Sequence, residues 1–441
     1  MAARRFTTIE DAAGFLDGLP KFSLDGLKAA RFGLDQTKTF CERAGNPQDR
    51  VRTIHVAGTN GKGTTCQMLA SVFQQAGYKT GLYTSPHLLE YNERIRINSR
   101  NIPDRSIVGF FNRFGPLLES VPLTYFEIST CMAFWHFAEE MCDIAIIETG
   151  LGGRLDATNI IDPLVSVITS VSADHMDVLG KTIPEIAREK AGIIKQGKPV
   201  VTGHLPEGAM KEAELKAASL HAELIRSSLY RPGFNDGLIE LTEPGSQNGV
   251  SIDGRGRKPV DRFNVAIVMA VVDVLSGQFP GLKDSFTAGV EKTESRFPDH
   301  ARFQKLLSGR SWYFDGAHNP EAIGSLMEQV LAMGPDREPV FFLSFMKDKI
   351  VPGLLENFQP YKYVYYIDSG RERNADCNQI RSQIPQAECL SSDDPDIEGL
   401  LEGLKSKLVI FAGSFYFYRQ VKYWMASQPP SDHKKNPGLC P

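Results

Sequence analysis

The chain has 441 residues, of which 42% are hydrophobic and 23% are charged, and its formal net charge is −4. This length exceeds one compact core, so at least two domains are expected, and the composition is that of a globular protein. The near balance of charges excludes a general basic field for nucleic acid, and no apolar run is long enough for a membrane helix. We therefore expect small-molecule partners, with no nucleic acid and no membrane.

Short apolar runs alternate with helical patterns along the first two thirds of the chain. Strands are expected at residues 53–58, 142–148, 165–169 and 199–203. Continuous apolar strands separated by helices indicate a mostly parallel sheet that is buried on both faces. This pattern predicts an α/β domain, which we place at residues 1–297.

A turn-rich region at residues 227–258 favours short antiparallel strands in a peripheral extension, and a helical stretch follows at 264–275. A second α/β alternation then begins, with strands expected at 312–315, 339–343, 363–367 and 408–412. It predicts a smaller, Rossmann-like α/β domain at residues 298–427. The last residues, 428–441, are rich in proline and poor in apolar side chains, which is typical of a disordered tail.

The cysteines are scattered and none forms a C-x-x-C pair. They are Cys41, Cys66, Cys131, Cys142, Cys377, Cys389 and Cys440. We expect all of them to be free thiols in a reducing compartment. The N-terminal residues lack the apolar core of a signal peptide, so a cytoplasmic location is expected.

The first expected strand runs into a glycine-rich loop that contains a lysine, Gly58-Thr-Asn-Gly-Lys-Gly-Thr-Thr65, and a helical stretch follows at 66–76. Glycines let backbone N–H groups approach a polyphosphate, and the helix N-terminus and Lys62 supply positive potential. ATP is the expected ligand, with contacts from Thr59, Asn60, Gly61, Lys62, Gly63 and Thr64. The loop departs from the usual P-loop because Gly63 directly follows Lys62. On this loop alone, a kinase, a GTPase or a transport ATPase remains open.

Several further segments with potential functional residues follow this variant loop along the chain. They are Tyr83-Thr-Ser-Pro-His-Leu88, Thr124-Tyr-Phe-Glu127, Glu148-Thr-Gly-Leu-Gly-Gly-Arg-Leu-Asp-Ala-Thr-Asn159, Asp174-His175, Arg188-Glu-Lys-Ala-Gly192, Asp315-Gly-Ala-His-Asn-Pro320, Lys347-Asp-Lys349 and Gly413-Ser414. Each segment is modest in isolation, but together they are specific. The chain resembles the dihydrofolate synthase/folylpolyglutamate synthase branch of the Mur ligase superfamily over nearly its whole length except the tail.

The resemblance implies a P-loop-type ATPase domain at the N-terminus and an ATP- and Mg²⁺-dependent ligase that joins L-glutamate to a folate-type carboxylate. The γ-phosphate of ATP would pass to the carboxylate, and the amine of glutamate would attack the resulting acyl phosphate. Such phosphoryl transfer relies on positioning and on cations that neutralise charge, here Mg²⁺ and Lys62. Dihydropteroate and tetrahydrofolate are the implied acceptors, and we favour one bifunctional chain.

The same resemblance implies that Ser85, Glu148 and His175 coordinate Mg²⁺. Lys190 matches a carbamylated lysine that would hold a second ion. Glu148 ends an apolar strand, which is where parallel sheets place ligand-binding groups. Without the resemblance, Glu148 would be interpreted as a helix cap or ion-pair partner, His175 as a loop histidine, and Lys190 as a solvated surface lysine.

The second domain is implied to contribute Arg302, Asp315 and His318 to the site on closure, which would exclude water from the acyl phosphate. The guanidinium group of Arg302 suits phosphate, while Asn264 matches a position that contacts adenine. The alternative is that Asp315 is only a turn former and Arg302 only a surface charge.

The pterin-facing residues implied by the resemblance lie in two segments: Thr124, Tyr125, Phe126 and Glu127 in the first, and Leu155, Asp156 and Ala157 in the second. Two departures affect this expectation. Ala301 stands before Arg302 where the family usually has glycine, and the segment Ala30-Arg-Phe-Gly-Leu34 lacks a frequent aspartate. The details of pteroate binding stay open.

Four rival functions remain. The acceptor could be a muropeptide or another substrate of the superfamily, or the chain could be a folylpolyglutamate synthase only. A P-loop switch or motor NTPase would hydrolyse ATP without an acceptor and leaves the 315–320 segment unexplained. A non-catalytic folate-binding protein is disfavoured because Lys62, Glu148, His175, Lys190 and Asp315 are all present. We expect a monomer, because no heptad or long apolar stripe indicates an interface.

Overall fold

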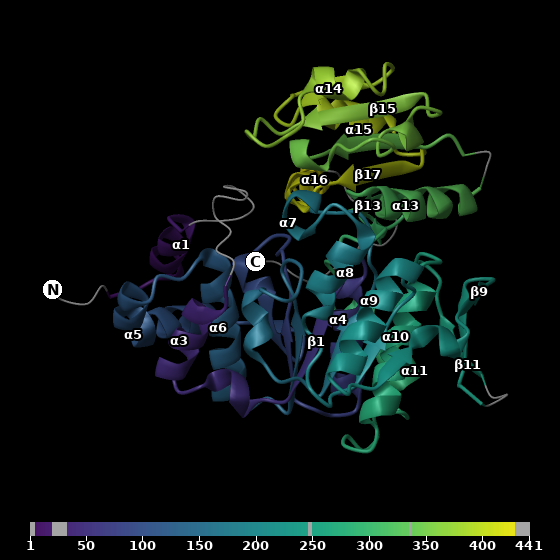
Figure 1. Ribbon diagram of the computed structural model, residues 1–441. Coiled ribbons are helices and arrows are strands. Elements are labelled where there is room, and N and C mark those ends of the chain that lie inside the picture. The colour runs from purple at the N-terminus through teal and green to yellow at the C-terminus, as the bar shows by residue number, and fades with distance from the viewer. Residues whose placement is uncertain (1–4, 20–32, 246–248, 335–336, 428–441) are drawn as a thin grey trace, which may run out of the picture. The chain divides into compact units, whose positions relative to one another are not determined.

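The computed structural model describes residues 5–19, 33–245, 249–334 and 337–427. The chain divides into two compact units, Met1–Pro298 and Asp299–Pro441 (Figure 1). The tail expected at 428–441 and residues 30–32 of the Ala30–Leu34 segment lie outside the described residues. Each unit is described by itself below.

A mixed, mostly parallel sheet forms the centre of the first unit. Within the described residues it has eight strands in the order β4-β3-β2-β5-β1-β6-β7-β8, and only β3 runs antiparallel to both of its neighbours, β2 and β4. The strands are β1 (Thr53–Ala57), β2 (Thr80–Tyr83), β3 (Ile95–Ile97), β4 (Arg100–Asn101), β5 (Ile144–Glu148), β6 (Val165–Ile168), β7 (Val200–Thr202) and β8 (Leu224–Arg226). The expected α/β fold with a mostly parallel sheet is confirmed.

Helices cover both faces of this sheet, because alternate residues of each strand point to opposite sides. On β5, Ile144 and Ile146 join the core beneath α4 and α10, while Ala145 and Ile147 join the core beneath α5 and α6. The helices of this unit are α1 (Ile9–Asp17), α3 (Asp35–Arg43), α4 (Lys62–Gln75), α5 (Asp104–Ser120), α6 (Tyr125–Glu139), α7 (Met176–Leu179), α8 (Ile183–Ala191), α9 (Glu207–Ser219), α10 (Asp261–Leu275), α11 (Phe286–Glu291) and α12 (Thr293–Arg296). Short 3₁₀ helices lie at η2 (Pro47–Arg50), η3 (Tyr91–Arg94), η4 (Ala157–Ile160) and η5 (Ser227–Tyr230).

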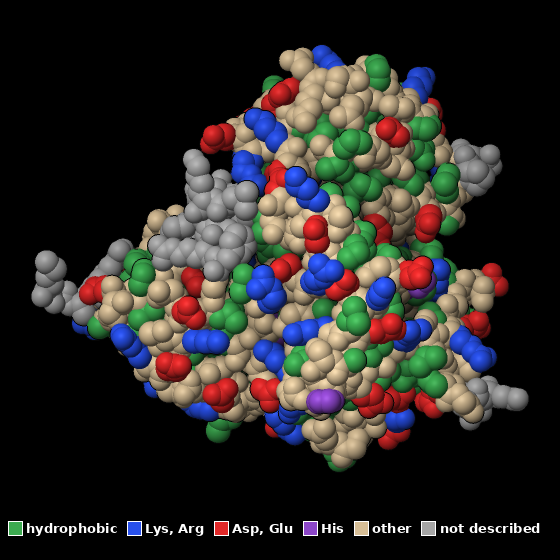
Figure 2. Space-filling model, in the orientation of Figure 1, with side chains coloured by type: hydrophobic (Ala, Val, Ile, Leu, Met, Phe, Trp, Pro, Cys, Tyr) green, Lys and Arg blue, Asp and Glu red, His purple; other side chains and the backbone are tan. Residues whose placement is uncertain are grey.

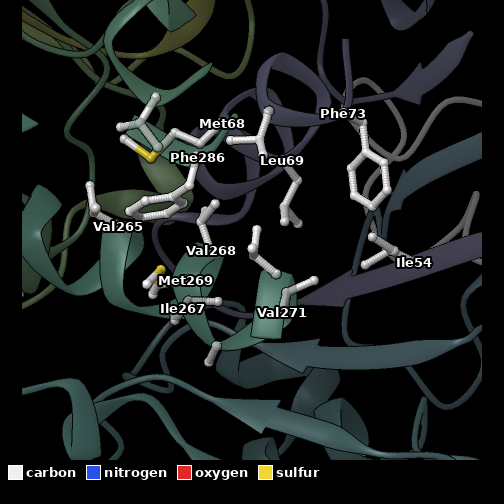
Figure 3. Close-up of a cluster of buried hydrophobic side chains, with 14 of the residues drawn as sticks. Ile54, Met68, Leu69, Phe73, Val265, Ile267, Val268, Met269, Val271 and Phe286 are labelled. Carbon is white, nitrogen blue, oxygen red and sulfur yellow. The ribbon is translucent and has the colours of Figure 1, made fainter. Parts of the chain in front are cut away.

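The core between β1, α4 and α10 holds the phosphate-binding loop in place. Ile54 of β1, Leu69 of α4 and Val268 of α10 are fully buried against one another in this cluster (Figure 3). Complete burial of an aliphatic side chain stabilises the fold by about 1.5–3 kcal/mol. The helix that follows the loop is therefore anchored along its whole apolar face.

The turn-rich region forms a small antiparallel sheet in the order β11-β10-β9, as expected. Its strands are β9 (Gly233–Asn235), β10 (Leu238–Thr242) and β11 (Gly249–Asp253). Ile239, Leu241 and Ile252 are buried in the core that also contains α10, so one face of this sheet packs into the core of the first unit.

The second unit is built on another mostly parallel sheet, which confirms the second expected α/β region. Its described strands have the order β12-β13-β17-β14-β15-β16, with β12 antiparallel to β13. They are β12 (Gln304–Lys305), β13 (Trp312–Asp315), β14 (Val340–Ser344), β15 (Tyr363–Asp368), β16 (Glu388–Ser391) and β17 (Val409–Gly413). The helices are α13 (Pro320–Ala332), α14 (Cys377–Arg381), α15 (Ile397–Gly403) and α16 (Phe415–Ser427), with 3₁₀ helices η6 (Lys347–Lys349) and η7 (Glu356–Phe358).

The expectation that every cysteine is a free thiol is wrong for one pair. Cys377, the first residue of α14, forms a disulfide with Cys389 in β16, and their Cα atoms are 6.1 Å apart. The chain reverses between α14 and β16, and this brings together two residues that are twelve positions apart and show no motif spacing. The other four described cysteines are free and buried, and Cys440 lies outside the described residues.

Charged side chains of both signs are interspersed over the face of the molecule in Figure 2. In the described ranges, no helix is both long enough and apolar enough to cross a membrane.

Candidate active site

The phosphate-binding loop connects β1 to α4 and needs glycine at two positions. Gly58 and Gly61 have φ angles of +158° and +82°. A Cβ on Gly58 would lie 1.9 Å from Thr169 Oγ1, and one on Gly61 would lie 2.5 Å from Asn264 Oδ1. Both glycines therefore allow a close approach to neighbouring elements that no other residue permits.

The end of the neighbouring strand β6 fixes the shape of this loop. The backbone N–H groups of Thr59 and Asn60 donate to the carbonyl oxygen and the hydroxyl of Ser170, both at 2.9 Å. Thr169 Oγ1 donates to the Asn60 carbonyl at 2.6 Å, and the Ser172 N–H donates to Thr59 Oγ1 at 3.1 Å. A loop held in this way is preorganised for a ligand.

Lys62 begins α4, so its charge adds to the positive end of a 14-residue helix. Its Nζ donates to the carbonyl oxygens of Gly58 and Thr59 at 2.9 and 3.1 Å. Asn264, in the first turn of α10, donates through Nδ2 to Asp261 Oδ1 at 3.0 Å and lies against Gly61. Thr64 is half-buried in the first turn of α4. The predicted nucleotide residues of the first unit are thus neighbours.

Glu148 links the phosphate loop to the segment that follows β2. It is the last residue of β5, it is only 4% exposed, and its Oε2 accepts the Ser85 N–H at 3.1 Å. A Cβ on Gly63 would lie 3.8 and 3.9 Å from its two carboxylate oxygens. Three separate sequence segments therefore meet at one carboxylate at the carboxyl edge of the sheet.

His175 lies directly before helix α7 and Lys190 lies within helix α8. His175 precedes α7 with φ +50°, and its Nε2 is 3.9 Å from Asp174 Oδ2. Lys190 in α8 is 3% exposed, so its interpretation as a solvated surface lysine is wrong. Burial is the main factor that lowers the pKa of Lys190 to about 7; the charge of Lys62 lowers it further, and Asp174 opposes the shift.

The described residues contain no group of three His, Cys, Asp or Glu side chains placed to hold a metal ion. The predicted magnesium set has only two residues of these types, Glu148 and His175, beside the hydroxyl of Ser85 and the amine of Lys190. A buried carboxylate oriented toward a phosphate loop suits a hard cation that keeps several water and phosphate ligands. The predicted residues are therefore compatible with a Mg²⁺ ion that takes its remaining ligands from water and phosphate.

The segment 124–127 uses its polar side chains to build the start of α6. Glu127 Oε2 accepts the N–H and the hydroxyl of Thr124 at 2.7 and 2.8 Å, which forms a capping box. Glu127 Oε1 accepts the hydroxyl of Thr37 at 3.3 Å. The aromatic residues Tyr125 and Phe126 are half-buried. Their partly exposed rings are the groups of this segment that could pack against an aromatic ligand.

The segment 155–157 is shaped by the carboxylate of Asp156. Its Oδ2 accepts the N–H groups of Gly150 and Leu151 at 2.9 Å, and its Oδ1 accepts the N–H and hydroxyl of Thr158 at 3.0 and 2.5 Å. Burial raises the pKa of Asp156, and these hydrogen bonds oppose that rise. Leu155 is half-buried and Ala157 is buried beside it. The carboxylate thus holds its own loop in place.

His55 of β1 continues this network inside the sheet. Because Thr158 donates its hydroxyl proton to Asp156, His55 Nε2 donates to Thr158 Oγ1 at 2.8 Å, and its buried Nδ1 has no hydrogen-bond partner in the described part of the chain. Burial and, to a lesser extent, Lys195 lower the pKa of His55 to about 3. The ring is therefore neutral at physiological pH.

In the second unit, Arg302, Asp315 and His318 surround the start of α16. Asp315, which ends β13, accepts the N–H groups of Phe303 and Ala317 at 2.7 and 2.9 Å. The guanidinium carbon of Arg302 lies 4.8 Å from the ring centroid of Phe415, and the His318 ring lies 5.7 Å from the same centroid. The three predicted residues are brought together there.

The departure at Ala301 is visible in the backbone. Ala301 has φ +49°, the left-handed conformation that glycine adopts without strain. A residue other than glycine therefore adopts the left-handed conformation directly before Arg302.

Comparisons with known proteins agree with this geometry. Residues 56–218 match the model of the Mur ligase middle domain. The dihydrofolate synthase/folylpolyglutamate synthase of Bacillus subtilis is 32% identical over 95% of this chain and 99% of its own length. The chain belongs to the dihydrofolate synthase/folylpolyglutamate synthase family.

Solved structures of this family have the same fold. The Escherichia coli FolC structure in complex with DHPP and ADP has a TM-score of 0.82 and 27% identity, and the match covers 96% of this chain and 98% of that one. A Mycobacterium tuberculosis folylpolyglutamate synthase complexed with ADP and AMPPCP has a TM-score of 0.80 and 26% identity, over 96% and 99% of the two chains.

Several residues that support the site were not predicted from the sequence. They are His55, Thr158, Thr169, Ser170, Ser172 and Phe415. The only signal available was position, because Thr169 ends an expected strand, and Ser170 and Ser172 follow it, at the edge where parallel sheets bind ligands. His55 carried no such signal, since its role depends on a contact with a residue 103 positions away.

Proposed function

We propose that the chain is an ATP-dependent ligase that joins L-glutamate to dihydropteroate, forming dihydrofolate, and to tetrahydrofolate, forming polyglutamates. Membership of the family supports the two acceptors. The observation that carries the chemistry is the buried Glu148 carboxylate, which lies between the Ser85 backbone and Gly63 of the phosphate loop. The carboxylate of an acceptor can be phosphorylated where the γ-phosphate of ATP lies beside a cation that Glu148 would hold.

The proposed reaction has two balanced steps. An oxygen of the acceptor carboxylate attacks the γ-phosphorus of ATP, and the bond to the ADP oxygen breaks. The amine of glutamate then attacks the acyl carbon, inorganic phosphate leaves with the carboxylate oxygen, and the amine loses a proton. Positioning and charge neutralisation account for most of the acceleration in phosphoryl transfer.

Individual residues have separate roles in this proposal. The loop from Thr59 to Thr64 cradles the phosphates through backbone N–H groups, and Lys62 neutralises charge. Asn264 contacts adenine. Arg302, Asp315 and His318 belong to the second unit and are proposed to contribute after nucleotide binding, with the guanidinium directed at phosphate and the other two orienting ligands.

Two Mg²⁺ ions are proposed to be held by Ser85, Glu148 and His175 and by Lys190 in a carbamylated form. The ions would neutralise the phosphate charge. The burial of Lys190 in α8 and its closeness to the charge of Lys62 support the carbamate, because conversion of the amine to an anion would remove an unfavourable cation from this site. Mass spectrometry of the intact protein in bicarbonate would detect the added mass.

The proposal is tested by ADP release from purified protein with ATP, Mg²⁺ and glutamate. Dihydropteroate, tetrahydrofolate, a muropeptide precursor and no acceptor are compared. Release that depends on dihydropteroate and on tetrahydrofolate is the expected result. A response to tetrahydrofolate alone would reduce the function to folylpolyglutamate synthase, and release without any acceptor would favour a P-loop NTPase.

A further inference from the structure

One buried arginine of the first unit differs from two others in having no anionic partner among the residues that the structure describes. Arg94, Arg96 and Arg257 are each 8% exposed. Arg96 donates to Asn101 and lies near Glu93, and Arg257 donates to the Val290 carbonyl and lies near Glu294. Arg94 forms no ion pair with any described carboxylate.

The contacts of Arg94 hold its side chain but leave most of its donors unused. Its Nε donates to His87 Nδ1 at 2.9 Å, and its guanidinium carbon lies 5.3 Å from the ring centroid of Tyr125. No described group accepts a hydrogen bond from its two terminal nitrogens. A guanidinium group that is 8% exposed and has no anion beside it is costly, so a rigidly placed one of this kind is suited to bind an anionic ligand.

The position of Arg94 in the sheet shows which part of a ligand could reach it. The Thr84 N–H donates to the Arg94 carbonyl at 3.0 Å, so Arg94 lies at the edge where Ser85 follows β2. The strand order β3-β2-β5-β1 then places Arg94, Ser85, Glu148 and the phosphate loop in one row along this edge. Ser85 and Glu148 therefore lie between Arg94 and the phosphates.

The charge of Arg94 also reaches the predicted pterin-facing segments. Burial raises the pKa of the Tyr83 phenol; Arg94 opposes that rise and Asp156 adds to it. Arg94 likewise opposes the rise in the pKa of Tyr91, whose ring lies 5.8 Å from that of Tyr125. Arg94 thus lies in the part of the first unit where we expect the acceptor.

We propose that Arg94 binds the α-carboxylate of the terminal glutamyl residue of a folate acceptor while the γ-carboxylate reacts beside Ser85 and Glu148. This inference rests on the proposed function. Adjacent strands are about 5 Å apart, which matches the three-carbon chain between the two carboxyl groups of a glutamyl residue. The forked donors of arginine suit a carboxylate that is held without reacting.

The two acceptors should therefore depend on Arg94 differently. Tetrahydrofolate ends in a glutamyl residue with a second carboxylate, whereas dihydropteroate ends in a benzoate that has only the reacting one. Arg94 contributes to the first acceptor alone and acts as a specificity-determining residue between the two reactions.

A thermodynamic cycle tests this pairing. Dissociation constants are measured by calorimetry for tetrahydrofolate and for its analogue with γ-aminobutyrate in place of glutamate, which lacks the α-carboxylate. Arg94→Gln should weaken tetrahydrofolate binding about 10- to 100-fold and leave the analogue and dihydropteroate within about twofold. Arg94→Lys should be intermediate, because it keeps the charge but loses the fork.

Arg96→Gln is the matched control, since Arg96 has the same exposure and lies two residues along the chain. It should leave the ratio between the two ligands unchanged. Equal weakening of all ligands by Arg94→Gln, or no weakening, would overturn the pairing. Acceptor-dependent ADP release by the unaltered protein is measured in parallel. If this release is present but the effects of Arg94→Gln and of removing the α-carboxylate on binding are additive, the role of Arg94 is wrong and the proposed function stands. If release is absent and tetrahydrofolate does not bind, both fail.

Discussion

The loop after β1 and the loop after β5 lie at the same edge of one sheet, yet they use polar side chains in opposite ways. In the phosphate loop, Ser170 and Thr169 come from a neighbouring strand to hold the backbone, and Lys62 adds charge to a helix terminus. In the second loop, the carboxylate of Asp156 is turned onto its own backbone. The loop that is proposed to bind phosphates is held by a neighbouring strand, whereas the loop that is proposed to face the acceptor is held by its own carboxylate.

Glu148 lies where the two loops meet, and its replacement should have the largest effect. Glu148→Gln should lower acceptor-dependent ADP release by about a thousandfold or more, because a neutral amide is a poor ligand for a hard cation. The melting temperature should hardly change, since the amide oxygen can still accept the Ser85 N–H. Glu139→Gln, which alters an exposed ion pair with Arg113, is the control and should leave turnover intact.

Asp156→Asn should mainly lower stability. An amide nitrogen in place of Oδ2 would face the N–H groups of Gly150 and Leu151, and one in place of Oδ1 would face that of Thr158, so donors would oppose one another in either orientation, with a loss of about 2–3 kcal/mol in the free energy of unfolding. Urea denaturation measures this loss. Asp162→Asn removes an exposed carboxylate paired with Lys198 and should change stability by less than about 0.5 kcal/mol. Equal stability of the two variants would contradict the assigned role.

Alanine variants at two glycines can distinguish the effect of backbone strain on stability from the effect of the phosphate-loop contact on ADP binding. Gly61 and Gly45 have φ angles of +82° and +87°, but only Gly61 would bring a Cβ against Asn264. Alanine at either position should lower stability by about 1–2 kcal/mol. Only Gly61→Ala should also weaken ADP binding, by about tenfold, because it displaces the side chain beside the loop. Similar ADP affinities for both variants, measured by calorimetry, would show that this contact does not matter.

The last prediction concerns the dependence of stability on pH. The pKa of His55 falls from 6.5 to about 3 on folding, mainly through burial and then through Lys195. The unfolded chain therefore binds a proton that the folded chain does not as pH falls through this window. Stability is complete above about pH 6.5 and decreases below it by up to about 1.4 kcal/mol per pH unit. Denaturation at about pH 7, 6 and 5 gives the free energy of unfolding at each pH, and His55→Gln should remove its decrease at low pH. The same decrease in the variant and in the unaltered protein would contradict this role of His55.

The sequence predicts the parts of this molecule that local patterns determine. Apolar runs mark β1, β5 and β6, and the glycines and lysine between β1 and α4 mark the phosphate loop. Strands β2 and β3 were not expected, because four- and three-residue strands beside a polar segment carry little periodic signal.

The contacts that refine the site could not be predicted because they depend on packing. Burial decides that Lys190 is not a surface lysine, and the register of β1 against η4 decides that His55 supports Asp156. The disulfide between Cys377 and Cys389 follows in the same way from a chain reversal rather than from spacing. The roles of Glu127 and Asp156 as ligand contacts stay predictions, since the oxygens of both accept hydrogen bonds from their own segments.

The most direct test of the account follows oxygen from the acceptor. Dihydropteroate labelled with ¹⁸O in its carboxylate is incubated with the protein, ATP, Mg²⁺ and glutamate, and inorganic phosphate is examined by mass spectrometry. An acyl phosphate predicts that each phosphate released with dihydrofolate carries one ¹⁸O atom. Unlabelled phosphate, released whether or not dihydropteroate is present, would contradict the ligase mechanism.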